Sequence, residues 1–493
     1  MRSPLSWLWI GFALTVILLY PGFMTWDSVE QLSQARTGEY VDWHPPVMAY
    51  IWSWVDRLIS GPFGMLLLVM ILVWTGTYKI ISSQLADVPQ SVRIAAIWVI
   101  IFFPPTFIPF AYIVKDNVMA GLLLVLYASV FALDRSYTRL LRRKYHMLAA
   151  VSGIVAVAVL AIAHRHNAFI AVFPALWFSA LLLYTKSGTG LTRHAKAITT
   201  ASVVLAGCVL LAGFINKTLT VHPTPSVLSL VVYDLTGMAI HEGQVFFAND
   251  PESPVPIIFK DQEPDLGELR EHYNSRDWVP LQAIFDLGKA KTDQDTARIV
   301  GYWLRSIVQH PSSYLQHRQG VFLNSLGLQH ERPGGLYVAP LTHSRHGDIE
   351  DSSLFISHNY RLSKLQEVTL SNGAEFLNRT WLTVPAFYMG FLFLYLAFQF
   401  ATTKGNFSPL FYLSLSAFLY NLTLFALAPS SDFRYSHWTL YVAWLVLVAI
   451  STQTLVKKAR QGKTPYGPSD QRPRIRPRNY VPYEKDRSGP NPS

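Results

Sequence analysis

Residues 135–163 read RSYTRLLRRKYHMLAAVSGIVAVAVLAIA, five basic residues followed by an apolar block without a single charge. A helix needs about 20 predominantly apolar residues to cross the hydrocarbon core of a bilayer, and this block approaches that length. Lys and Arg clustered beside such a block mark the cytoplasmic side of the membrane. The stretch therefore predicts a membrane span and also its orientation.

The rest of the chain repeats this pattern. Of its 493 residues only 15% are charged, whereas soluble domains carry about 25%. A polytopic α-helical membrane protein is therefore expected, not a series of soluble domains. The one cysteine, Cys208, lies within an apolar block and excludes a disulfide framework within the chain. We expect about ten spans, near 5–22, 62–82, 94–114, 117–133, 147–163, 168–184, 197–215, 380–400, 408–428 and 437–456.

The formal net charge of +10 suggests nucleic-acid binding until the charges are located along the chain. Residues 457–493 alone hold ten Lys/Arg against three acids, and their seven prolines and near-absence of aliphatic residues predict a disordered tail. We therefore interpret the basic charge as a topology signal and expect no nucleic-acid partner. The predicted regions are a membrane core over 1–215, an external (periplasmic) domain over 216–376, C-terminal spans over 377–456 and a cytoplasmic tail over 457–493. Both termini are expected on the cytoplasmic side of the cell inner (plasma) membrane.

The first external loop, residues 23–61, contains the sequence FMTWDSVEQL from Phe23 and GEYVDWHPP from Gly38. Four polar residues recur at helical spacing and predict a short helix along the membrane surface, with its polar face toward water: Asp27, Glu30, Gln31 and Gln34. Gly38 should end this helix, and the prolines that follow His44 should begin a second, interfacial one. Asp27 either caps the first helix, with Glu30 completing a capping box, or serves as a general base at the membrane surface; one carboxylate can do both.

The chain begins with an N-terminal span, which is followed by an acidic residue in an external amphipathic helix and then by an aromatic-Pro-Pro turn. In this order of features the chain resembles the GT-C glycosyltransferases. The branch that it is most similar to contains the protein O-mannosyltransferases and the aminoarabinose transferase. The resemblance implies a GT-C-like fold and an integral membrane enzyme that moves a sugar from a polyprenyl-phosphate carrier to a glycan, lipid or protein acceptor. It also implies inversion at the sugar, with Asp27 as the catalytic carboxylate and Asp42 as a second acid or an acceptor-positioning group. Ser28 stands where several relatives have a second acid, which leaves a divalent metal possible but not required.

A leaving lipid phosphate needs cations at the membrane surface. Three external residues are candidates for binding it: Lys115, Arg165 and Arg434. Candidate substrate-positioning residues beside them and in the first loop are Glu30, His44, Asp116, His164, His166, Asp432 and Tyr435. Each cation also has a structural interpretation. Lys115 can snorkel to the membrane surface beside a helix cap, Arg165 can contact a lipid headgroup, and Arg434 can form an ion pair near an aromatic belt.

Two other classes of function remain open on the sequence. A lipid or glycan transporter would need ionisable residues in the middle of its spans, where this chain has almost none. A non-catalytic partner in cell-envelope assembly would tolerate changes in the first external loop. His343 and His346 form a close histidine pair, but they lack the intervening glutamate and the helix of a zinc hydrolase, so no metal site is predicted there.

Overall fold

The computed structural model describes residues 4–140, 142–184, 190–329 and 380–461, and the pair His343 and His346 lies outside them. The chain divides into two compact units, residues 1–453 and 454–493. Within the described ranges the secondary structure consists of helices joined by turns and loops, with isolated bridges instead of strands. The expectation of a mainly helical chain is confirmed.

Seven described helical segments are long and apolar enough to cross a membrane, so the chain has the make-up of a multi-pass membrane protein. They comprise α4 (Phe63–Gln84), α7 (Lys115–Leu140), α8 (Lys144–His164), α10 (Gly190–Leu219), α18 (Pro385–Thr403), α19 (Pro409–Leu422) with α20 (Leu424–Leu427), and α21 (His437–Gln461) with the 3-10 turn η6 (Phe433–Ser436). Two shorter apolar helices, α1 (Pro4–Leu19) and α9 (Ala168–Leu183), fall on two further expected spans.

The expected straight span over 94–114 is instead a bent pair. Helix α5 (Gln90–Ile101) is followed by α6 (Pro104–Phe107) and the 3-10 turn η1 (Pro109–Ala111), with a bend of 64°. Prolines at the start of both short pieces explain the break, because they lack the amide hydrogen that would continue the preceding helix.

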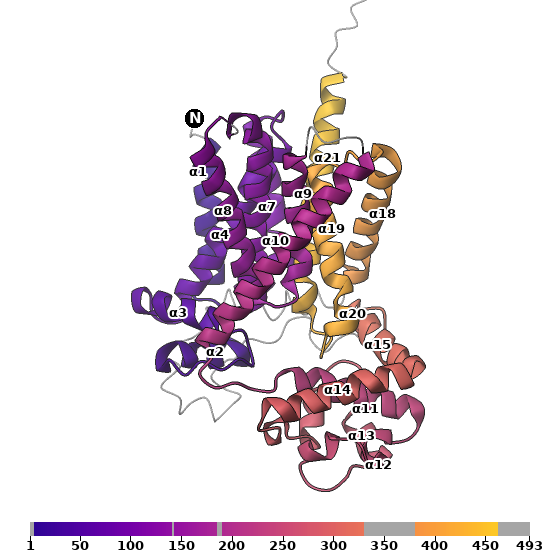
Figure 1. Cartoon of the computed structure of the whole chain (residues 1–493). Coiled ribbons are helices and arrows are strands. Elements are labelled where there is room, and N and C mark those ends of the chain that lie inside the picture. The colour runs from indigo at the N-terminus through magenta and orange to yellow at the C-terminus, as the bar shows by residue number, and fades with distance from the viewer. Residues whose placement is uncertain (1–3, 141, 185–189, 330–379, 462–493) are drawn as a thin grey trace, which may run out of the picture. The chain divides into compact units, whose positions relative to one another are not determined.

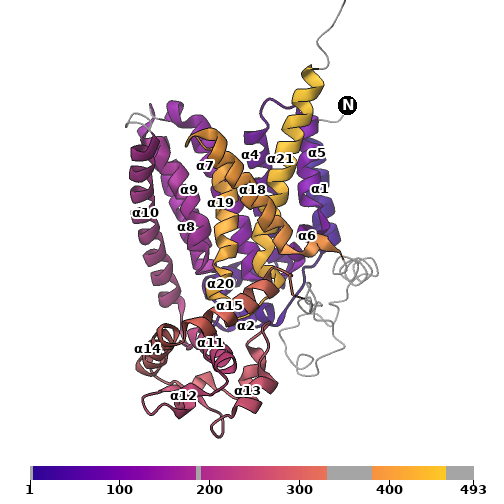
Figure 2. The same cartoon turned by 90° about the vertical axis from the view of Figure 1, so that its right-hand side faces the viewer.

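Small residues let the apolar helices approach each other closely. Helix α4 packs on α7, which also contacts α8, and α9 contacts both α10 and α19 (Figures 1 and 2). A Cβ added at Gly76 of α4 would lie 2.6 Å from the Cβ of Leu124 in α7, and one at Gly121 would lie 2.9 Å from that of Leu72. Glycine at these two positions therefore sets the close α4–α7 contact, as at many helix interfaces in membranes.

A second group of helices lies between α10 and α18 in the sequence. Its members are α11 (Val227–Glu242), α12 (Phe246–Asn249), α13 (Leu266–His272), α14 (Asp293–Gln309) and α15 (Pro311–Ser325). We call residues 220–329 the inserted segment. Its buried cluster includes Val231 and Leu281, and continues into Leu424, Ala428 and Tyr435 beside the C-terminal spans. The core of the inserted segment is thus continuous with the chain around α20 and η6.

The first loop folds as two helices, α2 (Trp26–Thr37) and α3 (Val47–Leu58). Gly38 ends α2 in the left-handed conformation, with a φ of 78°, and Pro46 precedes α3, both as expected. The expected cap at Asp27 is wrong: Thr25 caps α2, and a capping box joins it to Ser28. Because the two hydroxyls satisfy the end of the helix, the carboxylate of Asp27 is available for other partners.

The polar face of α2 is not the water-facing surface that the spacing predicts. Gln31 and Gln34 are buried, whereas Glu30 is exposed. The side-chain oxygen of Gln34 accepts a hydrogen bond from the amide of Val41 at 3.2 Å, so the following loop folds back over this face. Exposed Leu58 on α3 fits the expectation of a helix lying in an interface.

Candidate functional site

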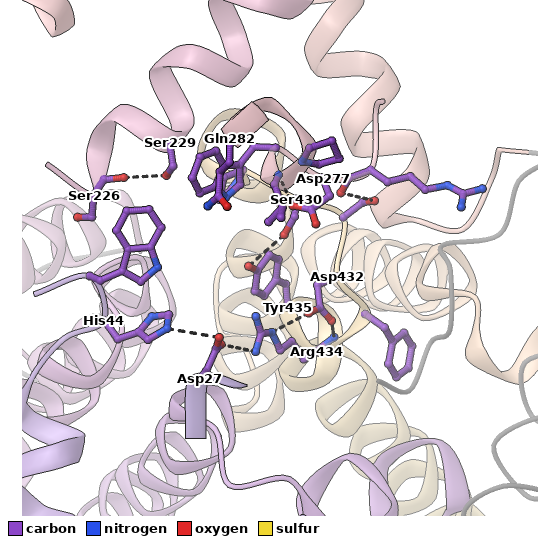
Figure 3. A pocket seen from close by; sticks show the side chains of 18 of the residues that line it. Asp27, His44, Ser226, Ser229, Asp277, Gln282, Ser430, Asp432, Arg434 and Tyr435 are labelled. Atoms are coloured by element: carbon purple, nitrogen blue, oxygen red, sulfur yellow. Dashed lines mark hydrogen bonds and ion pairs between the residues drawn. The ribbon is translucent and has the colours of Figure 1, made fainter. Parts of the chain in front are cut away.

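A cavity of about 740 Å³ lies where the first loop, the inserted segment and the η6 region meet (Figure 3). Such a volume is typical of small-molecule sites. Four sequence-predicted residues face each other here although they come from distant parts of the chain: Asp27, His44, Lys115 and Arg434 all line the cavity, as do Asp432 and Tyr435. The structure therefore brings together half of the predicted site residues.

Arg434 lies between two carboxylates. Its Nη1 is 2.6 Å from Oδ2 of Asp27, and its Nε is 2.7 Å from Oδ2 of Asp432. The amide of Arg434 also donates to Oδ1 of Asp432 at 3.0 Å, which fixes the start of η6. The guanidinium is therefore oriented by its own turn, and one of its edges is presented to Asp27 (Figure 3).

His44 connects the opposite side of Asp27 to Lys115. Nε2 of His44 is 3.4 Å from Oδ1 of Asp27, and Nδ1 contacts the Nζ of Lys115 at 2.5 Å. When Lys115 is an ammonium, which can only donate, Nδ1 accepts, and the proton of a neutral imidazole lies on Nε2, facing the carboxylate. Burial, then the charge of Lys115, lowers the pKa of His44, which favours this neutral form near pH 7.

Two carboxylates one helical turn apart have opposite properties. Burial would raise the pKa of Asp27, but the guanidinium of Arg434 and the hydrogen bond from His44 together hold it well below the usual range. Partial desolvation, then the negative charge of Asp27, raises the pKa of Glu30, whose Oε1 accepts a hydrogen bond from the side-chain Nε2 of Gln34 at 3.2 Å. With Arg434 and His44 as its partners, Asp27 is an ionised and weakly basic carboxylate in this structure.

The cavity does not fit a divalent cation. Among the residues that the structure describes, no three His, Cys, Asp or Glu side chains gather as metal ligands would. Magnesium and calcium prefer several carboxylate or carbonyl oxygens, but here the guanidinium of Arg434 already lies between the two nearest carboxylates, Asp27 and Asp432. We derive no chemical step through a metal.

Asp42 does not line the cavity. Its Oδ1 accepts hydrogen bonds from the amide of Thr224 at 2.6 Å and from its hydroxyl at 2.7 Å. The backbone of Tyr40 also accepts hydrogen bonds from the amides of Val221 and His222. In this structure Asp42 therefore ties the first loop to the beginning of the inserted segment, on the side that leads to the cavity wall.

Arg165 and Asp116 form a buried ion pair behind the cavity. The guanidinium of Arg165 lies 4.3 Å from the ring centre of Tyr435, which does line the cavity. His164 is buried at the end of α8, where its Nδ1 contacts the carbonyl of Leu160, and His166 is exposed in the turn before α9. Neither histidine lines the cavity.

The opposite wall of the cavity was not foreseen from the sequence. It comes from the inserted segment and includes Ser226, Ser229, Asp277, Trp278 and Gln282. These residues belong to no short motif. They reach the cavity because residues 276–278 run beside 429–431. There the amide of Trp278 donates to the carbonyl of Pro429, and the amide of Ser431 donates to the carbonyl of Arg276.

A buried polar network was not predicted from the sequence either. Oδ1 of Asp234 lies 3.0 Å from Nε2 of His317 and 2.5 Å from Nη2 of Arg318, and all three side chains are fully buried. Arg318 further donates to the carbonyl of Ala428 at 2.7 Å, and Trp303 donates to Asp234 at 3.0 Å. The network holds the inserted segment to the chain just before the loop that carries Arg434. An aspartate in the apolar run VVYDL was the available signal, because an isolated buried charge requires partners.

Comparison with known proteins gives one structural likeness. No protein-family model and no curated protein matches the chain. The archaeal oligosaccharyltransferase AglB from Archaeoglobus fulgidus, solved with an inhibitory peptide and a dolichol-phosphate, aligns over 94% of this chain, with 13% sequence identity and a TM-score of 0.35. The aligned part amounts to 52% of the length of that protein. A likeness at this level is too weak to assign an activity.

Proposed function

We propose that the protein is an integral membrane glycosyltransferase that moves a sugar from a polyprenyl-phosphate carrier to a cell-envelope acceptor, with inversion. The observation that carries this proposal is a carboxylate, Asp27, that faces a cavity between two cations, Lys115 and Arg434. Lys115 is the first residue of α7, and Arg434 lies in the turn before α21. Both cations are therefore at ends of apolar helices, the level at which the phosphate of a membrane lipid lies.

In the proposed reaction a hydroxyl of the acceptor attacks the anomeric carbon of the donor sugar. Asp27 takes the hydroxyl proton, a new carbon–oxygen bond forms, and the bond from the anomeric carbon to the phosphate oxygen breaks with its electron pair remaining on the phosphate. Negative charge thus grows on the leaving phosphate. Cations oriented toward developing charge are an effective means of lowering such a barrier.

The low pKa of Asp27 suggests how the base becomes active. While Arg434 is paired with it, the carboxylate is a poor proton acceptor. A phosphate that binds Arg434 and Lys115 takes over part of their charge, which raises the pKa of Asp27 toward the range useful for general base catalysis. The carboxylate then gains basicity only when a donor is bound, so its activation and donor binding are one event.

The remaining predicted residues receive supporting roles in this proposal. Arg165, paired with Asp116, supports the ring of Tyr435 from behind. Asp42 positions the loop that carries His44. His44 in turn orients Asp27 through its Nε2 proton.

The test is Asp27→Asn, which keeps the size of the side chain and removes the base. We expect transfer, measured as labelled sugar passed from polyprenyl phosphate to membrane material, to fall about 100-fold to 10,000-fold, the usual contribution of a general base. Glu252→Gln is the control, since it neutralises an exposed carboxylate of the inserted segment that pairs with Arg305 and does not line the cavity. Full transfer by a normally inserted Asp27→Asn protein would refute the assignment.

A further inference from the structure

The cavity extends well beyond Asp27 and its neighbours His44, Lys115 and Arg434. Its far wall carries Asp277 and Gln282 from the inserted segment, with the serines 226 and 229 at the start of α11 (Figure 3). This wall takes no part in the proposed proton transfer, and yet it contributes a carboxylate, an amide and two hydroxyls to the same space. It therefore has the capacity to bind a second, polar molecule.

Two tryptophans complete this wall. The rings of Trp43 and Trp278 have their centres 5.7 Å apart and are tilted by 42°, and both residues line the cavity. Trp43 belongs to the loop that carries His44, so the aromatic pair bridges the catalytic side and the far wall. Tryptophan offers a broad apolar face together with an N–H donor, which suits ligands that have one apolar face and a polar edge.

The polar groups of the wall can bond to a ligand. Oδ1 of Asp277 accepts from the amide of Val279 at 3.1 Å, which leaves further acceptor capacity on this half-buried carboxylate. The side chain of Gln282 is exposed at the cavity and brings both donors and an acceptor. A carboxylate and an amide that line the same cavity can each bond to neighbouring hydroxyls of a ligand.

The backbone around the wall disfavours a peptide ligand. Extended peptides commonly bind by adding a strand to a free backbone edge. Here residues 276–278 and 429–431, which line the cavity together, are already joined to each other by two backbone hydrogen bonds. The polar lining of this wall equally disfavours a lipid chain, which would need a continuous apolar groove.

We propose that the wall formed by Trp43, Trp278, Asp277 and Gln282 is the acceptor subsite and that the acceptor is a saccharide. A sugar ring has an apolar face for the indoles and vicinal hydroxyls for Asp277 and Gln282, and the cavity of about 740 Å³ is large enough for more than one ring. The proposal rests on the proposed function, since it names the acceptor of that reaction.

Binding is measured without turnover, by saturation-transfer NMR on the full chain in detergent. The probes are the methyl glycosides of glucose, galactose, mannose and N-acetylglucosamine, with a capped Ala-Ser-Ala peptide as the alternative ligand. We expect saturation of at least one glycoside and none of the peptide. Asp277→Asn and Gln282→Ala should each weaken glycoside binding about tenfold, which is the loss of a hydrogen bond in a polar site.

Two control variants test whether a glycoside binds at this wall. Gln316→Ala removes an exposed glutamine of α15 outside the cavity and should leave binding unchanged. Asp27→Asn should also bind the glycoside, because the base is not part of this wall. Binding of the peptide instead, of no glycoside, or of a glycoside unaffected by Asp277→Asn and Gln282→Ala would each overturn the saccharide proposal. An active Asp27→Asn enzyme that still binds glycosides would refute the proposed mechanism alone.

Discussion

The charge of Arg434 should control the proton affinity of Asp27, and this can be tested without any substrate. Two unit charges about 4 Å apart interact by about 4 kcal/mol at an effective dielectric constant of about 20, which corresponds to about 3 in pKa. The contact between Arg434 and Asp27 is of this kind, and the Asp27 side chain is 25% exposed, so solvent screens only part of it. Arg434→Gln should therefore raise the pKa of Asp27 by about 2 to 3.

Carbodiimide labelling followed by peptide mass spectrometry reports this change, because the reagent attacks only protonated carboxyls. In the unaltered protein we expect Glu30, whose pKa is raised, to be modified at about pH 5 while Asp27 is not modified even at pH 3.5. In Arg434→Gln, labelling of Asp27 should appear at pH 3.5. Glu30 lies on the same helix and serves as the internal standard.

A matched control removes an arginine far from the cavity. Arg305 pairs with Glu252 on an exposed face of the inserted segment, at 2.8 Å, so Arg305→Gln should leave the labelling of Asp27 unchanged. Equal labelling of Asp27 and Glu30 in the unaltered protein, or an Asp27 that ignores Arg434→Gln in a protein of native helicity, would contradict the coupling between the two side chains. Either result would remove the link between donor binding and base activation.

Three further predictions concern the site, the inserted segment and the topology. Because the donor phosphate is proposed to draw Arg434 from its carboxylate, the acid limb of kcat should lie at higher pH than that of kcat/KM, and coincident limbs would contradict this. Gly237→Ala should lower the free energy of unfolding by about 1 to 3 kcal/mol, because a Cβ would lie 2.0 Å from Nδ1 of His317. Circular dichroism should show this as a lower Tm. Gly301→Ala is the control: Gly301 has open space around it, so the Tm should be unchanged or slightly higher. Alkaline phosphatase fused after residue 240 should be active and after residue 140 inactive, and the reverse pattern would overturn the predicted orientation.

Hydropathy was sufficient for the helices because a membrane span is a local property: about 20 apolar residues form one wherever they occur. The end of α2 at Gly38 and the start of α3 after Pro46 were predictable for the same reason, because each residue acts through its own backbone conformation. The cap of α2 was misassigned because Asp27 and Thr25 both have capping side chains, and only the contact of Thr25 with Ser28 decides between them.

Contacts between side chains that are far apart in the chain could not be predicted from the sequence. That Asp27 faces Arg434, and that Asp42 bonds Thr224, depends on packing between distant segments, and no local pattern encodes it. The polar face of α2 was predicted to be exposed, but Gln34 on this face is buried. The following loop covers it, because the amide of Val41 donates a hydrogen bond to its side chain. Residue type alone therefore identified candidate residues but not the partners that the structure gives them.

The pairing of Asp27 with Arg434 joins residues 407 positions apart, and this separation has a consequence during synthesis. At about 5 to 20 residues per second, the ribosome needs about 20 to 80 s between the two. Throughout that interval the first-loop carboxylate lacks the guanidinium of Arg434, and the proposed phosphate site lacks one of its two cations. The nascent chain can therefore enter the membrane and fold most of its helices before the site exists, and chains that stop early never acquire a complete one.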